Sequence, residues 1–411
     1  MSLLDTLNKS IKGDSRLYWQ LREWYVVLTC LLAKRTDSPC SNKRPRLLFY
    51  HVKSLGHAGT EKFLQILARH LNKDAYDVYF MYPDHLDEHP DFAERLAYVT
   101  SGGVTMLPFN YKSVDKTPPY IVRGMNTPIE KVIDGLNIDV FITATIGCAN
   151  YPFSTLKKIP IILLNIFGQP NVQKNVSHHI CISKEVADKI SPIVPTEKIK
   201  ILPVPSEGPT RAAKAGGLVL RKKYSIPDTD IVFGRIGRND NNIHDPIAIE
   251  AFRLALKTNP NIHYLIMSPP PILVQHVKKE NIPNVYFIPP SGAEEDVWAF
   301  HAAIDVLAHF RNDGESFGLN IAESMLSGNP IISHRSHIWN AHLEYLDESF
   351  SRIAEKDDVD SYASYMLEFA KLHKQGALKA LGEKAAITGD TMFHIKNNIM
   401  QFEEYVTQAV T

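Results

Sequence analysis

Residues 312–333 read NDGESFGLNIAESMLSGNPIIS, and this stretch contains two glutamates, Glu315 and Glu323, with seven residues between them. Glu315 follows several turn-forming residues, whereas Glu323 lies about one turn inside the apolar run 319–326, which Gly-Asn-Pro ends. The pattern predicts one carboxylate in a loop and the other on a helix. Because Gly318 has no side chain where that helix begins, backbone N–H groups are exposed at its positive end, which suits a phosphate.

Glu323 is surrounded by apolar residues of the expected helix. A carboxylate on a mostly buried helix is costly unless hydrogen-bond donors reach it, and a pair of ribose hydroxyls would supply them. The alternative is an ordinary glutamate near a helix start, where its charge favours the helix dipole. Two glutamates at this spacing do not by themselves decide between these interpretations.

The complete stretch resembles the signature of retaining glycosyltransferase family 4. That signature has a glutamate, an aromatic residue and a glycine, a second glutamate, and then a small residue, a glycine and a proline. The matching residues are Glu315, Phe317, Gly318, Glu323, Gly328 and Pro330. The resemblance implies the α/β fold called GT-B, in which two doubly wound Rossmann-like domains face each other across a cleft and a carboxyl-terminal helix crosses back to the first domain.

The composition fits an ordinary globular protein of two or three domains, with 411 residues and 26 prolines. Lys and Arg number 45, as do Asp and Glu, so no net field favours nucleic acid as a partner. The cysteines are scattered without a C-x-x-C pair, which argues against a zinc site or a disulfide framework and for a cytoplasmic location. They are Cys30, Cys40, Cys148 and Cys181.

Residues 17–35 form an amphipathic pattern whose wholly apolar part, 24–33, is far shorter than the roughly 20 residues that span a bilayer. Charged and aromatic residues precede the apolar run, which is not typical of a signal peptide. Two interpretations stay open. The helix packs on its own domain, or it lies in the interface of the cytoplasmic membrane face and makes the protein peripheral there.

Residues 46–52 predict a buried strand, the loop GHAGTEK follows, and 63–71 predict a helix. This order opens a doubly wound nucleotide-binding fold. Gly56 and Gly59 suit a tight turn as well as a ligand contact, and the resemblance favours contact with the donor phosphates and the acceptor.

The composition changes at the prolines of 203–209 and the Ala/Gly-rich run 212–217, which predicts an interdomain linker. A second alternation of strands and helices follows, and strand 305–309 delivers the two-glutamate stretch to the carboxyl edge of a parallel sheet. Helices are predicted at 359–372 and 395–409. The predicted parts are an N-terminal extension 1–44, a first domain 45–205, a donor domain 206–385 and a crossing helix 386–411.

Arg235 and Arg238 lie in the loop sequence FGRIGRND directly after the first strand of the second domain. Two arginines at this spacing can offer bidentate donors to a diphosphate, and the alternative is a solvated surface loop. The family has a Gly-Arg pair at this strand end, which Gly237-Arg238 matches best.

Two family positions differ here. The lysine that usually follows the arginine by five residues is replaced by Ile243. The neighbouring His244 is a candidate substitute, because an imidazole can become charged when a phosphate is near. The family often carries a histidine at the end of the strand that is 161–167 here, but no histidine occurs between residues 130 and 177, which leaves Asn165 or a neighbour as a substitute.

Other histidines are interpreted mainly as core or surface residues, with metal ligation as a minor alternative for His334 and His337. They are His178, His179, His301, His309, His334 and His337. No metal ion and no cofactor are expected, because GT-B chemistry requires neither and the nucleotide sugar is a substrate.

The resemblance implies transfer of a sugar from a nucleoside diphosphate sugar to a carbohydrate, lipid-linked or other hydroxyl acceptor with retention of anomeric configuration. Arg238, with Arg235, would stabilise the leaving diphosphate together with the backbone of Gly318 and Leu319. Glu315 would hold donor sugar hydroxyls and Glu323 the ribose, with Ser316 and Phe317 completing the donor-binding set. A catalytically impaired GT-B relative, acting as a nucleotide-binding or scaffold subunit, is the alternative. A dehydrogenase is disfavoured and a P-loop enzyme excluded, because neither glycine motif occurs.

Overall fold

The computed structural model describes residues 44–51, 55–83, 92–109, 111–114, 122–125, 129–145, 156 and 159–410. The helix predicted at 17–35 lies outside these residues. The chain divides into two compact units. Unit 1 contains the described residues up to Cys181, Lys189–Lys200 and the chain from Ile399 onward, and unit 2 contains Ile182–Asp188 and Ile201–Asn398.

Unit 1 is built on a sheet with the strand order β3-β2-β1-β6-β7-β8-β9 among the described residues. The strands from β3 to β8 run parallel. Their bounds are β1 Arg46–Tyr50, β2 Asp77–Pro83, β3 Thr105–Phe109, β6 Val140–Thr145, β7 Ile161–Asn165, β8 Val176–Cys181 and β9 Ile199–Ile201. A separate antiparallel pair joins β4 Tyr111–Val114 to β5 Val122–Met125. Buried runs such as IILLN in β7 are typical of a parallel sheet covered on both faces.

The helix predicted at 63–71 is found as α3, Gly59–His70, which begins four residues earlier and includes the second half of the predicted glycine loop. Further helices of the first half of the chain are α4 Phe92–Ser101, α5 Ile129–Leu136, α6 Lys184–Ile190 and the 3-10 turn η2 Thr196–Lys198. The last helix, α14 Ile395–Val410, packs on unit 1: the rings of Phe402 and Phe49 lie 6.3 Å apart. The backbone N–H of Asn72 also donates to Glu403 over 2.8 Å. The predicted return of the final helix to the first domain is confirmed.

Unit 2 is built on a second parallel sheet with the order β12-β11-β10-β13-β15-β17 among the described residues. The strands are β10 Ile231–Ile236, β11 Ile262–Met267, β12 Val285–Ile288, β13 Val306–Ala308, β15 Ile331–His334 and β17 Ser351–Ala354. Two short strands, β14 Gly314–Glu315 and β16 Trp339–Asn340, pair with each other. The 3-10 turns are η3 Asn241–Ile243 and η4 Ala341–Glu344.

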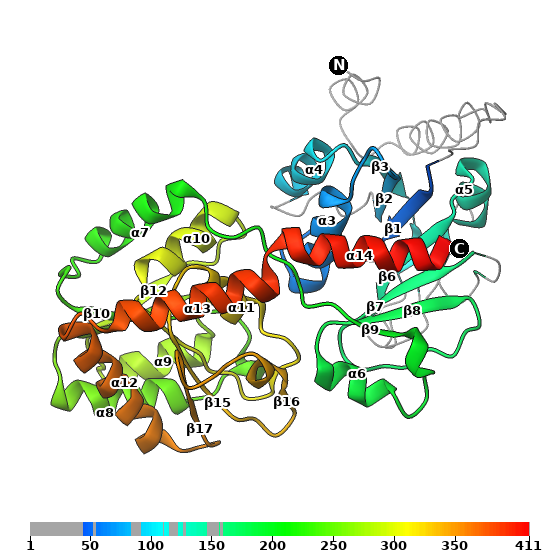
Figure 1. Cartoon of the computed structure of the whole chain (residues 1–411). Coiled ribbons are helices and arrows are strands. Elements are labelled where there is room, and N and C mark those ends of the chain that lie inside the picture. Colours follow the sequence, from blue (N-terminus) through cyan, green and yellow to red (C-terminus); the bar gives the residue numbers. More distant parts are fainter. Residues whose placement is uncertain are drawn as a thin grey trace. The chain divides into compact units, whose positions relative to one another are not determined.

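Helices cover both faces of the second sheet. Alternate residues of β10 point to opposite faces, so Phe233 joins the core under α8 Ile247–Thr258, α9 Pro271–Lys279 and α12 Val359–Lys374. Gly234 faces Phe300 of α10 Glu294–Ala303, which packs against α7 Arg211–Lys223. Helix α11 Leu319–Leu326 packs on α13 Leu378–Phe393. Figure 1 shows α8 with α12 on one side of this unit and α7 with α10 on the other.

The linker predicted at 212–217 is wrong, because these residues lie within helix α7. A Cβ atom at Gly217 would come within 2.6 Å of the backbone of Ala302 in α10, and one at Gly216 within 2.7 Å of Ala299. The small residues that resemble a linker in the sequence therefore allow two helices to approach closely. Helix α13 also escaped prediction, whereas the helices predicted at 359–372 and 395–409 are confirmed to within two residues.

Candidate functional site

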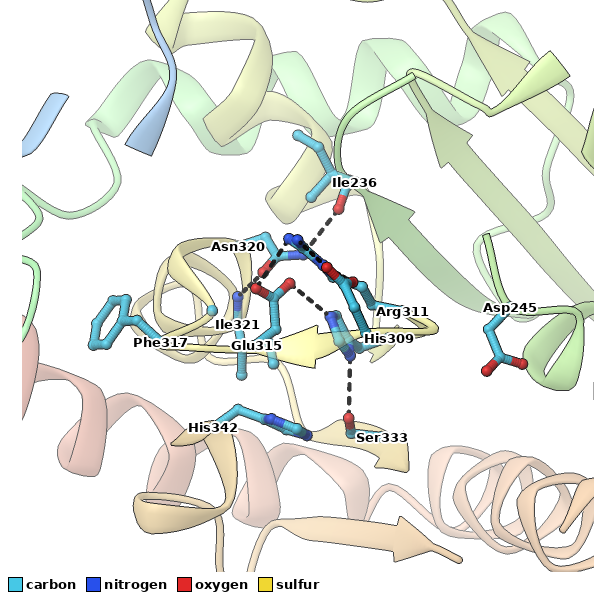
Figure 2. Close-up of polar contacts among 12 residues, drawn as sticks. Ile236, Asp245, His309, Arg311, Glu315, Phe317, Asn320, Ile321, Ser333 and His342 are labelled. Carbon is cyan, nitrogen blue, oxygen red and sulfur yellow. Dashed lines mark hydrogen bonds and ion pairs between the residues drawn. The ribbon is translucent and has the colours of Figure 1, made fainter. Parts of the chain in front are cut away.

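Polar side chains gather at the carboxyl edge of the sheet of unit 2, where the strand order reverses. From β10 the chain adds β11 and β12 on one side, while β13, β15 and β17 lie on the other. Open α/β sheets bind ligands at such a switch point. Arg235 lies near the end of β10, His309 directly follows β13, and Ser333 and His334 end β15. Figure 2 shows several of these side chains around Glu315.

Glu315 is the centre of this cluster. It lies in the short strand β14 rather than in the predicted loop, and its residue is only 9% exposed. His309 Nε2 lies 3.1 Å from one carboxylate oxygen, and an Arg311 N–H donates to the other over 3.3 Å. Arg311 is itself held by two hydrogen bonds to Asp313, of 2.6 and 3.0 Å. Both oxygens of Glu315 therefore have a protein partner.

The surroundings of Glu315 keep its carboxylate charged. Burial alone raises the pKa of this group, but the hydrogen bond from His309 and the charges of Arg311, His309 and His342 outweigh burial and lower the pKa to about 2. An ionised carboxylate accepts hydrogen bonds only, so the open lone pairs of Glu315 suit the hydroxyls of a ligand.

Arg235 places a buried positive charge beside this carboxylate. The residue is 2% exposed, its guanidinium lies 4.7 Å from the ring centre of Phe310, and one N–H reaches the carbonyl of Ser268 over 3.4 Å. Its Nε has no hydrogen-bond partner among the described residues. Burial lowers the pKa of Arg235 to about 10, partly offset by Tyr264 and Glu315, so the side chain is a cation at neutral pH. A buried and incompletely bonded cation is completed by an anionic ligand.

Arg238, which the family resemblance favoured, is exposed in the segment after β10, and no ion pair involves it in the described part of the chain. Arg235 follows Gly234, so the same Gly-Arg pair also occurs at the strand end itself. Of the two arginines, Arg235 is the one that interacts electrostatically with Glu315.

The start of α11 supplies backbone donors next to the cluster. Gly318 adopts φ +92°, a conformation that favours glycine, and the helix begins at Leu319 as predicted. The amides of Ile321 and Ala322 donate to the Gly318 carbonyl, whereas those of Leu319 and Asn320 have no acceptor among the described residues. Two unsatisfied amides at a helix start are suited to binding an anion.

Glu323, on the second turn of α11, has a histidine partner of its own. The residue is 5% exposed, and its carboxylate lies 3.7 Å from Nε2 of the fully buried His301 on α10. The two glutamates of the opening stretch therefore each face a buried imidazole, from α10 in one case and from the end of β13 in the other.

Phe317 supports the site rather than lining it. Its ring packs on those of Tyr345 and Phe393, at 5.9 and 5.5 Å, and Figure 2 shows it pointing away from the Glu315 carboxylate. Ser316 and Leu319 are half-buried. In unit 1, the carbonyl of Gly56 accepts from Gln65 over 3.1 Å.

The positions that depart from the family pattern carry no replacement charge. Ile243 is buried in η3. In the glycine loop of unit 1, where the family pattern is kept, a Cβ atom at Gly59 would meet open space. Burial, followed by the charge of Arg235, lowers the pKa of His244 to about 4, so its imidazole is neutral without a bound anion. The amide of Asn165 closes a turn: its oxygen accepts from the N–H groups of Gly168 and Gln169.

Sequence reasoning missed His309 and Arg311 as partners of Glu315. The available signal was their position, since His309 ends the strand predicted at 305–309 and Arg311 lies four residues before Glu315. His334 uses both ring nitrogens inside the protein, with the Arg311 N–H at 3.2 Å and the Arg335 carbonyl at 2.8 Å. Among the described residues, every helix is too short or too polar to cross a bilayer.

A family model matches residues in the second half of the chain. Residues 219–386 match the family described as glycosyl transferases group 1. This match contains Arg235, Glu315 and Glu323, and it agrees with the resemblance at the level of group 1 glycosyltransferases. No curated protein matches the sequence.

Solved structures share the fold over most of the chain. HepE of Anabaena, solved in complex with UDP and glucose, has 16% identity and a TM-score of 0.66, and the likeness covers 89% of this chain and 100% of HepE. A glycosyltransferase of Rickettsia africae has 14% identity and a TM-score of 0.68, with 89% and 99% covered. Sucrose-phosphate synthase of Thermosynechococcus elongatus has 15% identity and a TM-score of 0.62, also with 89% and 99% covered. The chain therefore has the GT-B fold.

Proposed function

We propose that this protein transfers a sugar from a nucleoside diphosphate sugar to a hydroxyl of a carbohydrate or lipid-linked acceptor, with retention at the anomeric carbon. The observation that carries the proposal is the meeting of the buried cation Arg235 and the ionised carboxylate Glu315 at the switch point of the sheet. A diphosphate and a hydroxyl-rich sugar are the two groups that this pair suits. The group 1 family match and the UDP and glucose held by HepE support this class of donor.

In the proposed reaction the bond between the anomeric carbon and the diphosphate oxygen breaks, and the acceptor oxygen bonds to that carbon on the same face. The nucleoside diphosphate leaves with the bonding electrons and takes up the proton of the acceptor hydroxyl. Arg235 and the open amides of Leu319 and Asn320 stabilise the charge that develops on the leaving group. Arg238 is exposed and lies three residues after Arg235 in the sequence. In this proposal it makes a further contact with the diphosphate once the donor is bound.

Glu315 binds hydroxyls of the donor sugar in this proposal, and Glu323 binds the ribose. Each carboxylate would hold its hydroxyls in one orientation, which favours reaction by positioning. The reaction requires no metal ion or other cofactor, and we place it in the cytoplasm, as the scattered cysteines predict.

A thermal-shift screen tests donor binding. UDP, GDP, ADP, CMP and dTDP are each added alone and as sugar conjugates. A ligand at a hundredfold its dissociation constant adds about 2.7 kcal/mol to the free energy of unfolding, a shift of a few degrees for a chain of this size. We expect one base to raise the melting temperature, and the absence of a shift with every nucleotide would contradict the proposal.

A transfer assay with the selected donor tests catalysis, with free sugar and transferred sugar separated by chromatography. Glu315→Gln keeps the size of the side chain but removes its charge, so it should bind the nucleotide normally and lose transfer. Glu368→Gln is a matched control on α12, where the carboxylate pairs with Arg352. Binding without transfer by the wild-type chain would favour the scaffold alternative.

A further inference from the structure

His309 is hydrogen-bonded at both ring nitrogens, although the sequence analysis interpreted it only as a core or surface residue. The residue is 2% exposed, with Nε2 at 3.1 Å from Glu315 and Nδ1 at 3.1 Å from the hydroxyl of Ser333. Figure 2 shows the ring between these two groups. Because the Glu315 carboxylate is ionised and can only accept, Nε2 carries the hydrogen. In the neutral ring Nδ1 then accepts from Ser333, which fixes the tautomer.

The sheet holds this arrangement in place. Strand β13 pairs with β15 so that Ala308 lies opposite Ile332, and the N–H of His309 donates to the Ile332 carbonyl over 2.8 Å. The hydroxyl of Tyr362, from α12, donates to the carbonyl of His309 over 2.9 Å. The backbone of His309 is therefore fixed on both sides, which is the kind of support that a precisely placed functional group needs.

The second partner of Glu315 is Arg311. Arg311 lies in the segment between β13 and β14 and shares its guanidinium with Asp313. His309 and Arg311 each occupy one carboxylate oxygen of Glu315. Since each oxygen can accept about two hydrogen bonds, one open site per oxygen remains for ligand hydroxyls.

We infer that His309 is a positioning residue for donor specificity: its Nε2–H, oriented by Ser333, aims the Glu315 carboxylate at the sugar of the nucleotide sugar. This inference rests on the proposed function for the identity of the ligand. It separates the two halves of the donor, because His309 acts on the sugar through Glu315 and leaves the nucleotide contacts to Arg235 and α11.

Two amide variants isolate the bond that matters. In His309→Gln the amide nitrogen replaces Nε2 and can still donate to Glu315, whereas in His309→Asn the shorter amide reaches toward Ser333 only. Both variants remove the ring and replace it by a polar side chain, so they form a matched pair. Ser333→Ala leaves Nδ1 without its donor and should weaken the same function to a smaller degree.

The first measurement is calorimetric binding of the nucleoside diphosphate selected in the screen and of its sugar conjugate. For His309→Asn we expect the conjugate to bind about tenfold or more weakly, the size of a charge-assisted hydrogen bond, with the affinity for the free diphosphate unchanged within about twofold. His309→Gln should keep both affinities within a few-fold of wild type. An equal loss of both affinities in His309→Asn, or no loss of either, would overturn the inference.

The second measurement needs no ligand. The carboxyl carbon of Glu315, assigned by its loss in Glu315→Gln, is titrated by NMR in 13C-glutamate-labelled protein. The inference requires an upward shift of its titration midpoint in His309→Asn and little shift in His309→Gln; equal midpoints in both variants would overturn it. If the wild-type chain binds no nucleotide, the proposed function fails, and this titration still decides whether His309 controls Glu315.

Discussion

The side-chain amide of Asn320 donates a hydrogen bond to the backbone carbonyl of Ile236 over 2.9 Å. This bond joins the first turn of α11 to the last residue of β10, as Figure 2 shows. The two elements carry the hydrogen-bond donors that we assign to the diphosphate, namely the open amides of α11 and the guanidinium of Arg235. The hydrogen bond from Asn320 therefore helps to fix the position of the α11 amides relative to Arg235, and a single substitution removes it.

Asn320→Ala should weaken nucleotide binding by more than it weakens the fold. Loss of the bond costs about 1 kcal/mol of stability, and the freed helix start no longer holds its amides beside Arg235. The affinity for the nucleoside diphosphate, measured by calorimetry, should fall several-fold. Asn397→Ala is the control, because the amide of Asn397 also donates to backbone carbonyls but joins the first turn of α14 to the last turn of α13. Equal affinities in both variants would contradict this role.

Arg235→Met should preserve or raise the stability of the unliganded protein and weaken its binding of the nucleoside diphosphate. Burial disfavours the charged form of Arg235, so replacing this side chain by an apolar one of similar length removes a desolvation cost from the unliganded protein. The variant should melt at or above the wild-type temperature without ligand, and below it with a saturating nucleoside diphosphate. Arg253→Met, which removes an ion pair to Glu250 on α8, should leave the melting temperature close to that of the wild type both without and with ligand. A variant that is destabilised without ligand would contradict the first expectation.

Gly318→Ala should destabilise unit 2 and weaken nucleotide binding together. The backbone at φ +92° disfavours any side chain by about 1–3 kcal/mol, and a Cβ would lie 2.9 Å from the hydroxyl of Tyr345. Gly376→Ala is the matched control, since Gly376 has φ +71° and open space at its Cβ, so it reports conformational strain alone. Urea unfolding compares the two. Tyr345→Phe removes the hydroxyl and should recover part of the Gly318→Ala loss in a double-mutant cycle.

Local signals explain what could be predicted from the sequence. The helix predicted to begin after Gly318 does so, because glycine suits the backbone angle of φ +92° at that position. The final helix was predictable because one apolar stripe repeats along it, and that stripe packs on unit 1 through Phe402. Such features are decided by neighbours in the sequence.

Contacts between distant residues explain what could not be predicted. Gly216 and Gly217 lower the helix propensity of α7, and their role becomes clear only from the close approach of Ala299 and Ala302 in α10. The partnership of His309 with Ser333 depends on the register between β13 and β15, and that of Glu315 with His309 on the turn that carries β14 back toward the sheet edge. Neither the strand register nor the path of the turn that carries β14 can be deduced from the local sequence. Glu315 was therefore predictable as a site residue, whereas its partner His309 was not.

His342 should make the protein less stable as the pH falls below about 6.5. Burial, followed by repulsion from His309, lowers the pKa of its ring in the folded state to about 3. Between these two values the unfolded chain binds a proton that the folded chain does not, so the free energy of unfolding decreases with falling pH by up to about 1.4 kcal/mol per pH unit. His342→Gln removes this titration while its amide can still bond to the carbonyl of His334, which His342 Nε2 approaches to 3.3 Å.

Urea unfolding at about pH 7, 6 and 5 should therefore show a shallower loss of stability in His342→Gln than in the wild-type chain. The difference isolates this ring, because the two proteins differ only at residue 342. His337→Gln is the control, since His337 is exposed in the segment after β15 and its removal should leave the wild-type slope. The sign is decisive: a steeper loss in His342→Gln would mean that the folded state stabilises the protonated ring, which is incompatible with the lowered pKa of His342.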